Sequence, residues 1–299
     1  MRLYVISQLP WCKTDYTTRY GKWAVISGST DGIGLAMARE LARRGHSIVV
    51  MGRNAGKLVS TKRSLEAEPN VGDVMTVCLD LAHASPSDYE RIREEIDPDN
   101  RDIGILINNA GIGPDDIDVF ESQNEVHMHE AVNVTIVSTI YLTKMMLPGM
   151  VRRRRGLIVN VSSVLGIVKY APFVGVYAPI KHFMSNLGLQ LMSESKQLSR
   201  PIDVVTLHAG PIATKLSSKH CKEGLAHVSL ESYARSAINA LSTRTESIVG
   251  SAWHALWLNC YLLFHPTGIC DILYNLIVRL SCTNSIGLNK KHQKHQKLI

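Results

Sequence analysis

The sequence predicts an α/β fold: a single doubly wound parallel sheet with helices on both faces, followed by a C-terminal apolar helical tail. From residue 22 onward, short β-branched runs alternate with longer stretches of helical periodicity. The runs are apolar throughout, as expected for strands that are buried on both faces of a parallel sheet. The first run also leads through a glycine-rich turn directly into a helix, which is typical of dinucleotide-binding folds.

Six strands and five helices follow from these patterns. We expect strands at 23–26, 47–51, 74–78, 103–107, 157–161 and 202–207, and helices at 33–44, 57–67, 89–96, 125–153 and 181–195. The first helix illustrates the reasoning, because Leu35, Ala38 and Leu41 fall on one face at helical spacing. The chain then divides into a short leader (1–21), a cofactor-binding domain (22–246) and a C-terminal segment (247–299).

The C-terminal segment is apolar at first and basic at its end. Residues 247–270 contain no Asp, Glu, Lys or Arg, and Trp253 and Trp257 belong to a helically spaced apolar set. Asn259 and the Pro266–Gly268 break argue against a membrane-spanning helix. A helix on the membrane surface or a lid over an apolar substrate tunnel fits better, and a core helix or a homodimer contact is an equal alternative. The first eleven residues lack the features of a signal peptide.

The net charge of +7 and the pI of about 9.1 come largely from two clusters, Arg152–Arg155 and four lysines after residue 289. Neither cluster is interleaved with aromatic residues, so nucleic acid is not an expected partner. The arginines are expected to close the long helix, where cations complement the helix dipole. The six cysteines form no CxxC pair and the twelve histidines no HExxH pattern, so we expect no metal site.

The turn after the first strand has the residue types of a diphosphate-binding loop. Glycines allow a tight turn, close approach of the backbone to phosphates and close packing of helix on strand. The free N–H groups of the following helix then point at the phosphates. The residues expected to bind the cofactor here are Gly28, Ser29, Gly32, Ile33 and Gly34.

This glycine spacing and four later motifs resemble the short-chain dehydrogenase/reductase family. Asn108-Asn109-Ala110-Gly111 follows the fourth strand, Asn133 lies inside the long helix, Ser162-Ser163 ends the fifth strand, and Tyr177-Ala178-Pro179-Ile180-Lys181 matches the family's YxxxK. Of the ten tyrosines, Tyr177 alone has a lysine four residues later. The motifs occur in order over residues 22–215, so the resemblance implies a Rossmann fold and an oxidoreductase.

The resemblance implies roles that the chemistry explains. A lysine one helical turn after Tyr177 lies on the same face, and an ammonium there lowers the pKa of the phenol from about 10 toward neutrality. Tyr177 would exchange a proton with the substrate oxygen, and Ser163 would hydrogen-bond the same oxygen. Lys181 would also bind the nicotinamide ribose, and Asn133 would order a water that relays protons to Lys181.

The second strand indicates NADP(H) as the cofactor. NAD enzymes place an acidic residue after this strand to bind the ribose 2′-hydroxyl, whereas this chain has Arg53, which suits a 2′-phosphate. The family resemblance adds Asp80 at the adenine, Thr214 at the nicotinamide amide, and Asn109, Ala110 and Gly111 beside the cofactor.

Within the family the chain is most similar to the 17-beta-hydroxysteroid dehydrogenase and very-long-chain 3-oxoacyl-CoA reductase branch. The expected reaction is reduction of a lipophilic ketone, a 3-oxoacyl-CoA or a 17-keto-steroid, to a secondary alcohol. Alternatives are a retinal or other lipid-carbonyl reductase, or a catalytically weak NADP-binding interaction protein. The expected location is the cytosolic face of the endoplasmic reticulum membrane, with cytoplasm or mitochondria as alternatives.

Three departures from the family pattern affect the expected site. Ser163 precedes Tyr177 by one residue more than in relatives, which leaves open whether Ser162 or Ser163 faces the tyrosine. Pro179 is compatible with the helix only if it lies in the first turn. Ser27 stands where a threonine is usual and keeps the hydroxyl group.

Overall fold

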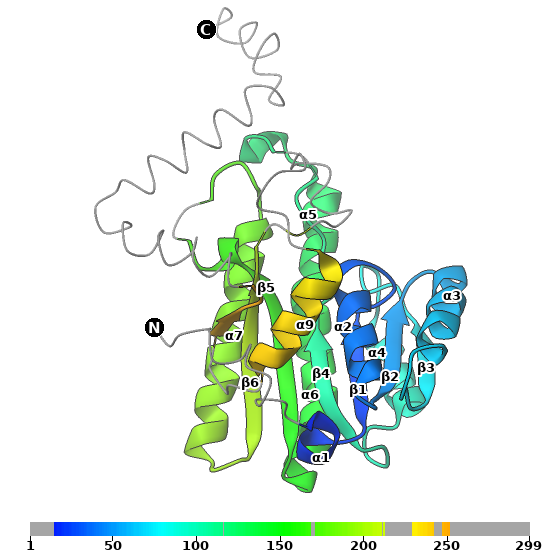
Figure 1. Cartoon of the computed structure of the whole chain (residues 1–299). Coiled ribbons are helices and arrows are strands. Elements are labelled where there is room, and N and C mark those ends of the chain that lie inside the picture. The colour runs from blue at the N-terminus through cyan, green and yellow to red at the C-terminus, as the bar shows by residue number, and fades with distance from the viewer. Residues whose placement is uncertain are drawn as a thin grey trace, which may run out of the picture.

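The structure, a computed structural model, describes residues 15–115, 117–168, 171–210, 212, 229–241 and 247–251. Within them, seven parallel strands form one sheet in the order β3-β2-β1-β4-β5-β6-β7 (Figure 1). The strands are β1 (Trp23–Ser27), β2 (Ser47–Gly52), β3 (Val74–Cys78), β4 (Ile103–Asn108), β5 (Gly156–Ser163), β6 (Ile202–Ala209) and β7 (Ser247–Val249). All six predicted strands are confirmed.

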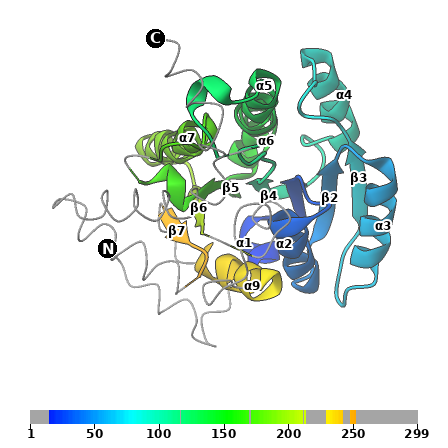
Figure 2. The same cartoon turned by 90° about the horizontal axis from the view of Figure 1, so that it is seen from above.

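Helices cover both faces of the sheet, as the sequence predicts (Figure 2). The helices are α1 (Tyr16–Tyr20), α2 (Gly32–Arg43), α3 (Ala55–Glu66), α4 (Pro86–Ile96), α5 (Glu125–Val132), α6 (Ser138–Arg153), α7 (Tyr177–Gln197) and α9 (Leu230–Leu241). The short elements are η2 (Phe120–Ser122), the π-helical turn η3 (Asn133–Val137) and η4 (Val164–Gly166). The predicted helix 125–153 is therefore α5, η3 and α6 in direct succession.

Side chains alternate between two hydrophobic cores because successive residues of a strand point to opposite faces. In β1, Ala24 and Ile26 belong to one core together with α1, α2 and α9, and Val25 belongs to the other together with α4 and α6. The helices after β1 and β4 thus lie on opposite faces. The crevice between the carboxyl ends of these two strands is where open α/β sheets bind ligands.

The boundary expected at residue 246 does not coincide with the end of the sheet. Ser247–Val249 form β7, which pairs in parallel with Thr206–His208 of β6. The first residues assigned to the helical segment are therefore a strand of the domain. Residues 252–299, which include the tryptophans and lysines of that segment, lie outside the described residues, so the rest of the division remains a prediction.

The arginine cluster ends α6, as expected, and also ties the loop before β4 to the helix. Arg153 donates to the backbone oxygens of Pro98 and Ile103, and Arg155 pairs with Asp102 at 2.9 Å. Arg154 adopts a left-handed conformation (φ 55°) as the C-cap. Arg153 and Arg155 of this cluster therefore form contacts within the fold.

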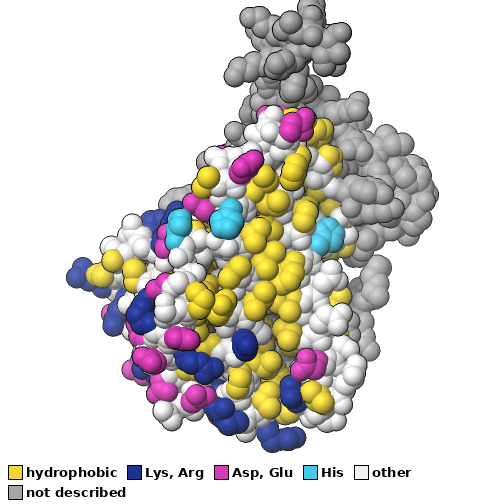
Figure 3. Space-filling view, turned by 180° about the vertical axis from the view of Figure 1, so that it is seen from behind, with side chains coloured by type: hydrophobic (Ala, Val, Ile, Leu, Met, Phe, Trp, Pro, Cys, Tyr) yellow, Lys and Arg dark blue, Asp and Glu magenta, His cyan; other side chains and the backbone are white. Residues whose placement is uncertain are grey.

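The continuous helix from Glu125 to Arg153 is long and apolar enough to cross a membrane by composition alone. However, 56% of its most apolar window is buried, and a core helix that packs against a sheet meets the same criteria. It is weak support for a membrane span. Figure 3 shows a band of hydrophobic side chains on the side of the molecule opposite to the view of Figure 1. Ile140 of α6 and Leu189 of α7 are exposed apolar side chains.

Two buried histidines make the stability of the fold sensitive to acid. His46, at the start of β2, is fully buried, and one ring nitrogen has no hydrogen-bond partner among the described residues. Burial lowers the pKa of His46 from 6.5 to about 4, and burial lowers the pKa of His208 in β6 to the same value. The unfolded chain therefore binds more protons than the folded chain between pH 6.5 and 4.

We predict that the free energy of unfolding falls as the pH is lowered from 6.5 to about 4, by roughly 3 kcal/mol per buried histidine. Chemical denaturation at several pH values measures this slope. His46→Asn removes one titrating group and should flatten the slope, whereas His83→Asn, on a side chain that is 68% exposed, should not. Equal slopes for wild type and His46→Asn would contradict the assignment.

Candidate active site

The glycine-rich turn has the backbone geometry that a diphosphate-binding loop requires. Gly28 and Gly32 have φ values of 65° and 56°, which favour glycine. A Cβ atom on Gly34 would lie 2.4 Å from Asn109 Nδ2 and 2.5 Å from Gly28 O. The turn therefore packs too closely against the loop after β4 to admit a side chain at Gly34. Asp31 caps α2 by accepting a hydrogen bond from Gly32 N.

Ser27 and Asn109 bind the two loops of the crevice together. The Ser27 hydroxyl accepts hydrogen bonds from Asn109 N and Ala110 N, both at 3.0 Å. Asn109 Nδ2 donates in return to Ser27 O and Gly28 O. The Ser29 side chain, which we expected to contact the cofactor, instead forms hydrogen bonds within the fold. Its hydroxyl donates to Ile26 O and accepts from Met51 N. Its backbone remains at the turn.

The residues expected around the adenosine end lie after β2 and β3, which pair with each other. Arg53 makes no side-chain hydrogen bond or ion pair with any residue that the structure describes, so its guanidinium is available to a ligand. Asp80 accepts from Ala82 N at 3.2 Å and lies 3.3 Å from His83 Nδ1. Thr214, expected at the nicotinamide, lies outside the described residues.

Ser163, Tyr177 and Lys181 come together at the carboxyl end of β5. Tyr177 is the first residue of α7, which places Pro179 in the first turn of the helix, where proline is tolerated. The Ser163 side chain is near enough to the Tyr177 hydroxyl to act on the pKa of the phenol. Lys181 Nζ lies 5.7 Å from the centre of the Tyr177 ring and donates to Val161 O at 3.1 Å. The extra residue between Ser163 and Tyr177 leaves this arrangement intact.

The structure gives the two serines different positions. Ser162 Oγ donates to Lys181 O at 2.7 Å and lies 3.1 Å from Ser185 Oγ, so it fastens α7 to β5. Ser163 is the one beside Tyr177. Strand geometry explains the difference, because neighbouring residues of β5 point to opposite faces. His208 of β6, which the sequence analysis did not single out, lies with Nδ1 3.2 Å from Ser163 O.

The pKa of Tyr177 is shifted in the direction opposite to the one that the sequence analysis predicted. Burial raises the pKa of Tyr177, and its hydrogen bond to Ser163 only partly opposes this. Burial also lowers the pKa of Lys181 from 10.5 to about 8. Desolvation disfavours the charged form of both groups. At Tyr177 it outweighs the lowering of the pKa that a lysine four residues later predicts. Tyr177 therefore keeps its proton at neutral pH.

Asn133 does not join these residues. Its Nδ2 atom donates to Ala82 O at 2.8 Å and lies 3.2 Å from His129 Nε2, so it anchors the loop after β3 to the helix. Thr135, in the same π-helical turn, is the residue near Lys181: a Cβ atom on Gly111 would lie 3.3 Å from Lys181 Nζ and 3.5 Å from Thr135 Oγ1. The helical spacing of Thr135, Thr139 and Leu142 could have revealed this inward face.

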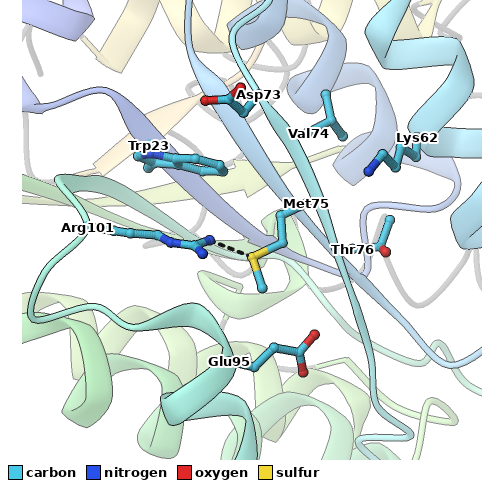
Figure 4. A pocket seen from close by; sticks show the side chains of 8 residues that line it. All are labelled: Trp23, Lys62, Asp73, Val74, Met75, Thr76, Glu95 and Arg101. Carbon is cyan, nitrogen blue, oxygen red and sulfur yellow. Dashed lines mark hydrogen bonds between the residues drawn. The ribbon is translucent and has the colours of Figure 1, made fainter.

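A second hollow lies at the other end of the sheet. An open groove of about 530 Å³ lies between β3, the start of β1, and the helices α3 and α4, which contribute Lys62 and Glu95 (Figure 4). Arg101 lies 5.1 Å from the Trp23 ring centre and 2.7 Å from Met75 Sδ. The Ser163–Tyr177 arrangement is at the carboxyl ends, so this groove is separate from it. No group of His, Cys, Asp or Glu suited to a metal is present among the described residues.

Comparison with known proteins agrees with this geometry. A family model described as short chain dehydrogenase matches residues 22–224, more than half of the 299-residue chain. The chain belongs to the short-chain dehydrogenase family. It is thus an oxidoreductase that acts on CH–OH and C=O groups, and its family binds a nicotinamide cofactor.

Relatives of this dehydrogenase include proteins of the branch that the sequence indicated. It is 34% identical to the 17-beta-hydroxysteroid dehydrogenase type 3 of Danio rerio, over 81% of this chain and 76% of the relative. It is also 34% identical to a very-long-chain 3-oxoacyl-CoA reductase of Caenorhabditis briggsae, over 94% of this chain and 86% of the relative. The Gallus gallus hydroxysteroid dehydrogenase-like protein 1 is 34% identical over 81% of this chain and 71% of its own.

Solved structures show the same fold. A short-chain dehydrogenase from Sphingobium yanoikuyae in complex with NADPH superposes with a TM-score of 0.68 at 24% identity, covering 81% of this chain and 95% of that one. A 7beta-hydroxysteroid dehydrogenase gives a TM-score of 0.72 at 20% identity, covering 83% and 94%. At these identities the likeness establishes the fold of this dehydrogenase.

Ser27→Ala removes the acceptor of two backbone N–H groups, a part-buried one of Asn109 and a buried one of Ala110. We predict that it lowers the free energy of unfolding by roughly 1–3 kcal/mol per unpaired group and weakens nicotinamide-cofactor binding, because the glycine-rich turn loses its anchor. Ser27→Thr keeps the acceptor and is the matched control. Denaturation and cofactor titration measure the two effects, and a Ser27→Ala variant as stable as wild type would show that these bonds do not stabilise the crevice.

Proposed function

We propose that the protein is an NADPH-dependent reductase that converts a lipophilic ketone to a secondary alcohol, with Tyr177 as the general acid. The observation that carries the proposal is the contact of the Tyr177 hydroxyl with Ser163, one helical turn from Lys181, at the carboxyl ends of the strands. The residues present fit a nicotinamide nucleotide: a glycine turn with no room for a side chain, a helix N-terminus and an unpaired Arg53.

Each residue has a defined task in this proposal. When bound, a nicotinamide cofactor would supply the hydride that the carbonyl carbon gains. Tyr177 gives its hydroxyl proton to the carbonyl oxygen, and Ser163 donates a hydrogen bond to the same oxygen, which polarises the carbonyl group. Lys181 is held close to Tyr177 by its bond to Val161 O and would bind the nicotinamide ribose. Asp80 and the Asn109–Gly111 loop would line the rest of the cofactor site.

The direction of the pKa shift at Tyr177 supports reduction. A phenol with a raised pKa carries its proton at neutral pH, which is the form required to protonate a developing alkoxide. In the reverse direction the same residue must first lose its proton. Alcohol oxidation is therefore expected to gain more from alkaline pH than ketone reduction does.

The substrate class rests on the relatives. We propose a 3-oxoacyl-CoA or a 17-keto-steroid, with a retinal or another lipid carbonyl as the alternative within the same chemistry. By the same reasoning the protein would act at the cytosolic face of the endoplasmic reticulum membrane, as a homodimer that uses the hydrophobic band of Figure 3. NADPH consumption measured across long 3-oxoacyl-CoAs, steroids and retinal identifies the class, and analytical ultracentrifugation tests the dimer.

Peripheral membrane contact is proposed for the segment after β7. Its uncharged, tryptophan-containing stretch precedes four lysines, and each lysine near an anionic surface contributes about 1 kcal/mol. A chain that ends at residue 251 keeps β7 and is the appropriate truncation for a liposome flotation assay. Flotation equal to that of the full chain would remove the segment as the anchor.

A second candidate is a catalytically weak NADP-binding protein that acts through interactions. The extra residue between Ser163 and Tyr177 is the observation that favours it, and the proximity of these two side chains argues against it. Cofactor binding without turnover on any substrate of the panel would favour this candidate over the reductase.

Arg53→Ala should reduce the preference for NADPH over NADH. A charge-assisted hydrogen bond to the 2′-phosphate contributes roughly 1.5–3 kcal/mol, or about one to two decades in affinity. Titration of both nucleotides into wild type and variant measures the ratio. Arg63→Ala, on the exposed side of α3, is the charge-matched control. Tighter binding of NADH than NADPH by the wild type would overturn the cofactor assignment.

Tyr177→Phe should abolish turnover while NADPH still binds. The phenyl ring preserves the packing but has no proton to donate, and acid–base catalysis contributes about 10²–10⁴-fold to the rate. Ser163→Ala should lower kcat by roughly 10²–10³-fold, and Ser162→Ala less. Tyr141→Phe, on a ring stacked against Tyr89, is the matched control. Steady-state kinetics on variants of verified stability make the comparison, and an active Tyr177→Phe variant would refute the mechanism.

A further inference from the structure

His208 is a buried titratable side chain beside the site that the proposed function does not use. It lies near the end of β6 and is 2% exposed. Its neighbour Ala209 is the last residue of β6 and pairs with Ser163, the last residue of β5. The imidazole ring therefore lies where the pairing of these two strands ends, next to the residue pair that contains Ser163.

The hydrogen bond of this ring identifies its tautomer. His208 Nδ1 lies 3.2 Å from the backbone oxygen of Ser163. A carbonyl oxygen can only accept a hydrogen bond, so Nδ1 carries the hydrogen. Burial lowers the pKa of His208 to about 4, so the ring is neutral at neutral pH and Nδ1–H is its one donor. That donor is used to hold a single peptide carbonyl group.

The peptide group that His208 holds is the one at which β5 turns into η4. Ser163 is still extended (φ −139°, ψ 160°) and is the N-cap of η4, which follows directly. Its C=O group lies in the same rigid plane as the N–H group of Val164. A hydrogen bond that fixes this C=O group therefore fixes the direction in which η4 leaves the strand.

The direction of η4 in turn sets the orientation of the Ser163 hydroxyl. Leu165 N, within η4, donates to Ser163 Oγ at 3.2 Å. A hydroxyl oxygen that accepts this bond keeps its own hydrogen for another partner. In the proposed reaction that partner is the carbonyl oxygen of the substrate. Contacts thus run from His208 through the backbone of Ser163 to Leu165 N, and from there back to the Ser163 hydroxyl.

We infer that His208 is a positioning residue for ketone reduction: its Nδ1–H group holds the Ser163 carbonyl and so directs the Ser163 hydroxyl at the substrate oxygen. The inference rests on the proposed function. His208 acts through Ser163 and exchanges no proton with the substrate, so its loss should slow the chemical step without weakening the binding of NADPH.

A second buried histidine provides a matched control. His46 Nδ1 lies 3.2 Å from the backbone oxygen of Lys22, the side chain is fully buried, and burial lowers its pKa to about 4 as well. His46 lies just before β2, at the amino ends of the strands, whereas His208 lies near the carboxyl end of β6. The two histidines therefore share a type of hydrogen bond and differ in their position relative to the site.

His208→Leu tests the inference because it removes the donor and keeps a side chain of similar size. We expect kcat for ketone reduction to fall about tenfold, the effect of one lost hydrogen bond, and KM for NADPH to change less than about twofold. His208→Asn places an amide N–H group near the position of Nδ1 and should restore most of kcat. His46→Leu should destabilise the fold to a similar extent as His208→Leu and leave kcat unchanged.

A double-mutant cycle shows whether His208 acts through Ser163. Once Ser163→Ala has removed the hydroxyl, its orientation no longer matters, so adding His208→Leu should lower kcat less than about twofold further. Full additivity of the two changes would overturn the inference, because His208 would then act by another route. A His208→Asn variant as slow as His208→Leu, or a folded His208→Leu variant with the kcat of wild type, would overturn it as well.

NMR of nitrogen-labelled histidine rings tests the same hydrogen bond in the wild type, including the case in which His208→Leu does not fold. The His208 signals are identified by their loss in His208→Asn. A neutral ring protonated at Nδ1 is the expected result, and a ring protonated at Nε2 would refute the inference. A wild type that oxidises NADPH with none of the substrates would instead overturn the proposed function and the catalytic task of His208 with it, whatever the tautomer.

Discussion

The hydrogen bonds between Ser27 and Asn109 join the loops after β1 and β4, the two neighbouring strands at which the strand order of the sheet reverses. β1 and β4 are neighbours, but the chain leaves them toward opposite faces, so the loops after them would separate without a link. The Ser27 hydroxyl accepts two backbone N–H groups of the second loop, and the Asn109 amide donates to two carbonyl oxygens of the first. Gly34 can then pack directly on Asn109, which sets the orientation of α2 and of its free N–H groups.

A buried polar network continues this link across the sheet. Asn108 Nδ2 donates to Thr143 of α6 and to Asn160 of β5, and Asn160 donates onward to Met184 O of α7. Ser162 adds a bond to Lys181 O. Buried donors without partners are costly, so each bond restricts the positions available to the next element. The glycine-rich turn and the start of α7 are thereby held in one rigid frame, and the Tyr177–Lys181 pair is placed relative to the crevice.

Several arginine side chains of the described fold are also paired with carboxylates or backbone oxygens. The arginines at the end of α6 are engaged by Asp99, Asp102 and backbone oxygens, and Arg43 and Arg44 by Glu68 and Glu40. Arg53, in contrast, makes no side-chain ion pair within the described chain. Within the described residues, Arg53 is therefore a cationic group after β2 that no carboxylate neutralises. Such a group suits recognition of one phosphate.

Local sequence was sufficient to predict the six strands, the helices between them, the glycine-rich turn and the Tyr177–Lys181 pair. These features depend on hydrophobic periodicity and on short spacings within one element. The helix α9 carries such a signal too, since Tyr233, Ala237 and Leu241 are buried at helical spacing, but the sequence analysis did not place it. The three residues of β7 are too few to show a period, and their strand exists because the edge of β6 pairs with them.

Tertiary structure decided what depends on rotation, pairing and burial. The long helix turns Thr135 toward Lys181 and Asn133 toward Ala82, a difference that the family's asparagine motif did not predict. The alternation of β5 separates Ser163 from Ser162. Burial reverses the expected shift of the Tyr177 pKa, because loss of water around a phenolate outweighs a nearby lysine that is itself desolvated. The sequence by itself determined that Ser163, Tyr177 and Lys181 meet; the packing around them determined that Thr135 and not Asn133 lies near Lys181, and which protons the pair holds.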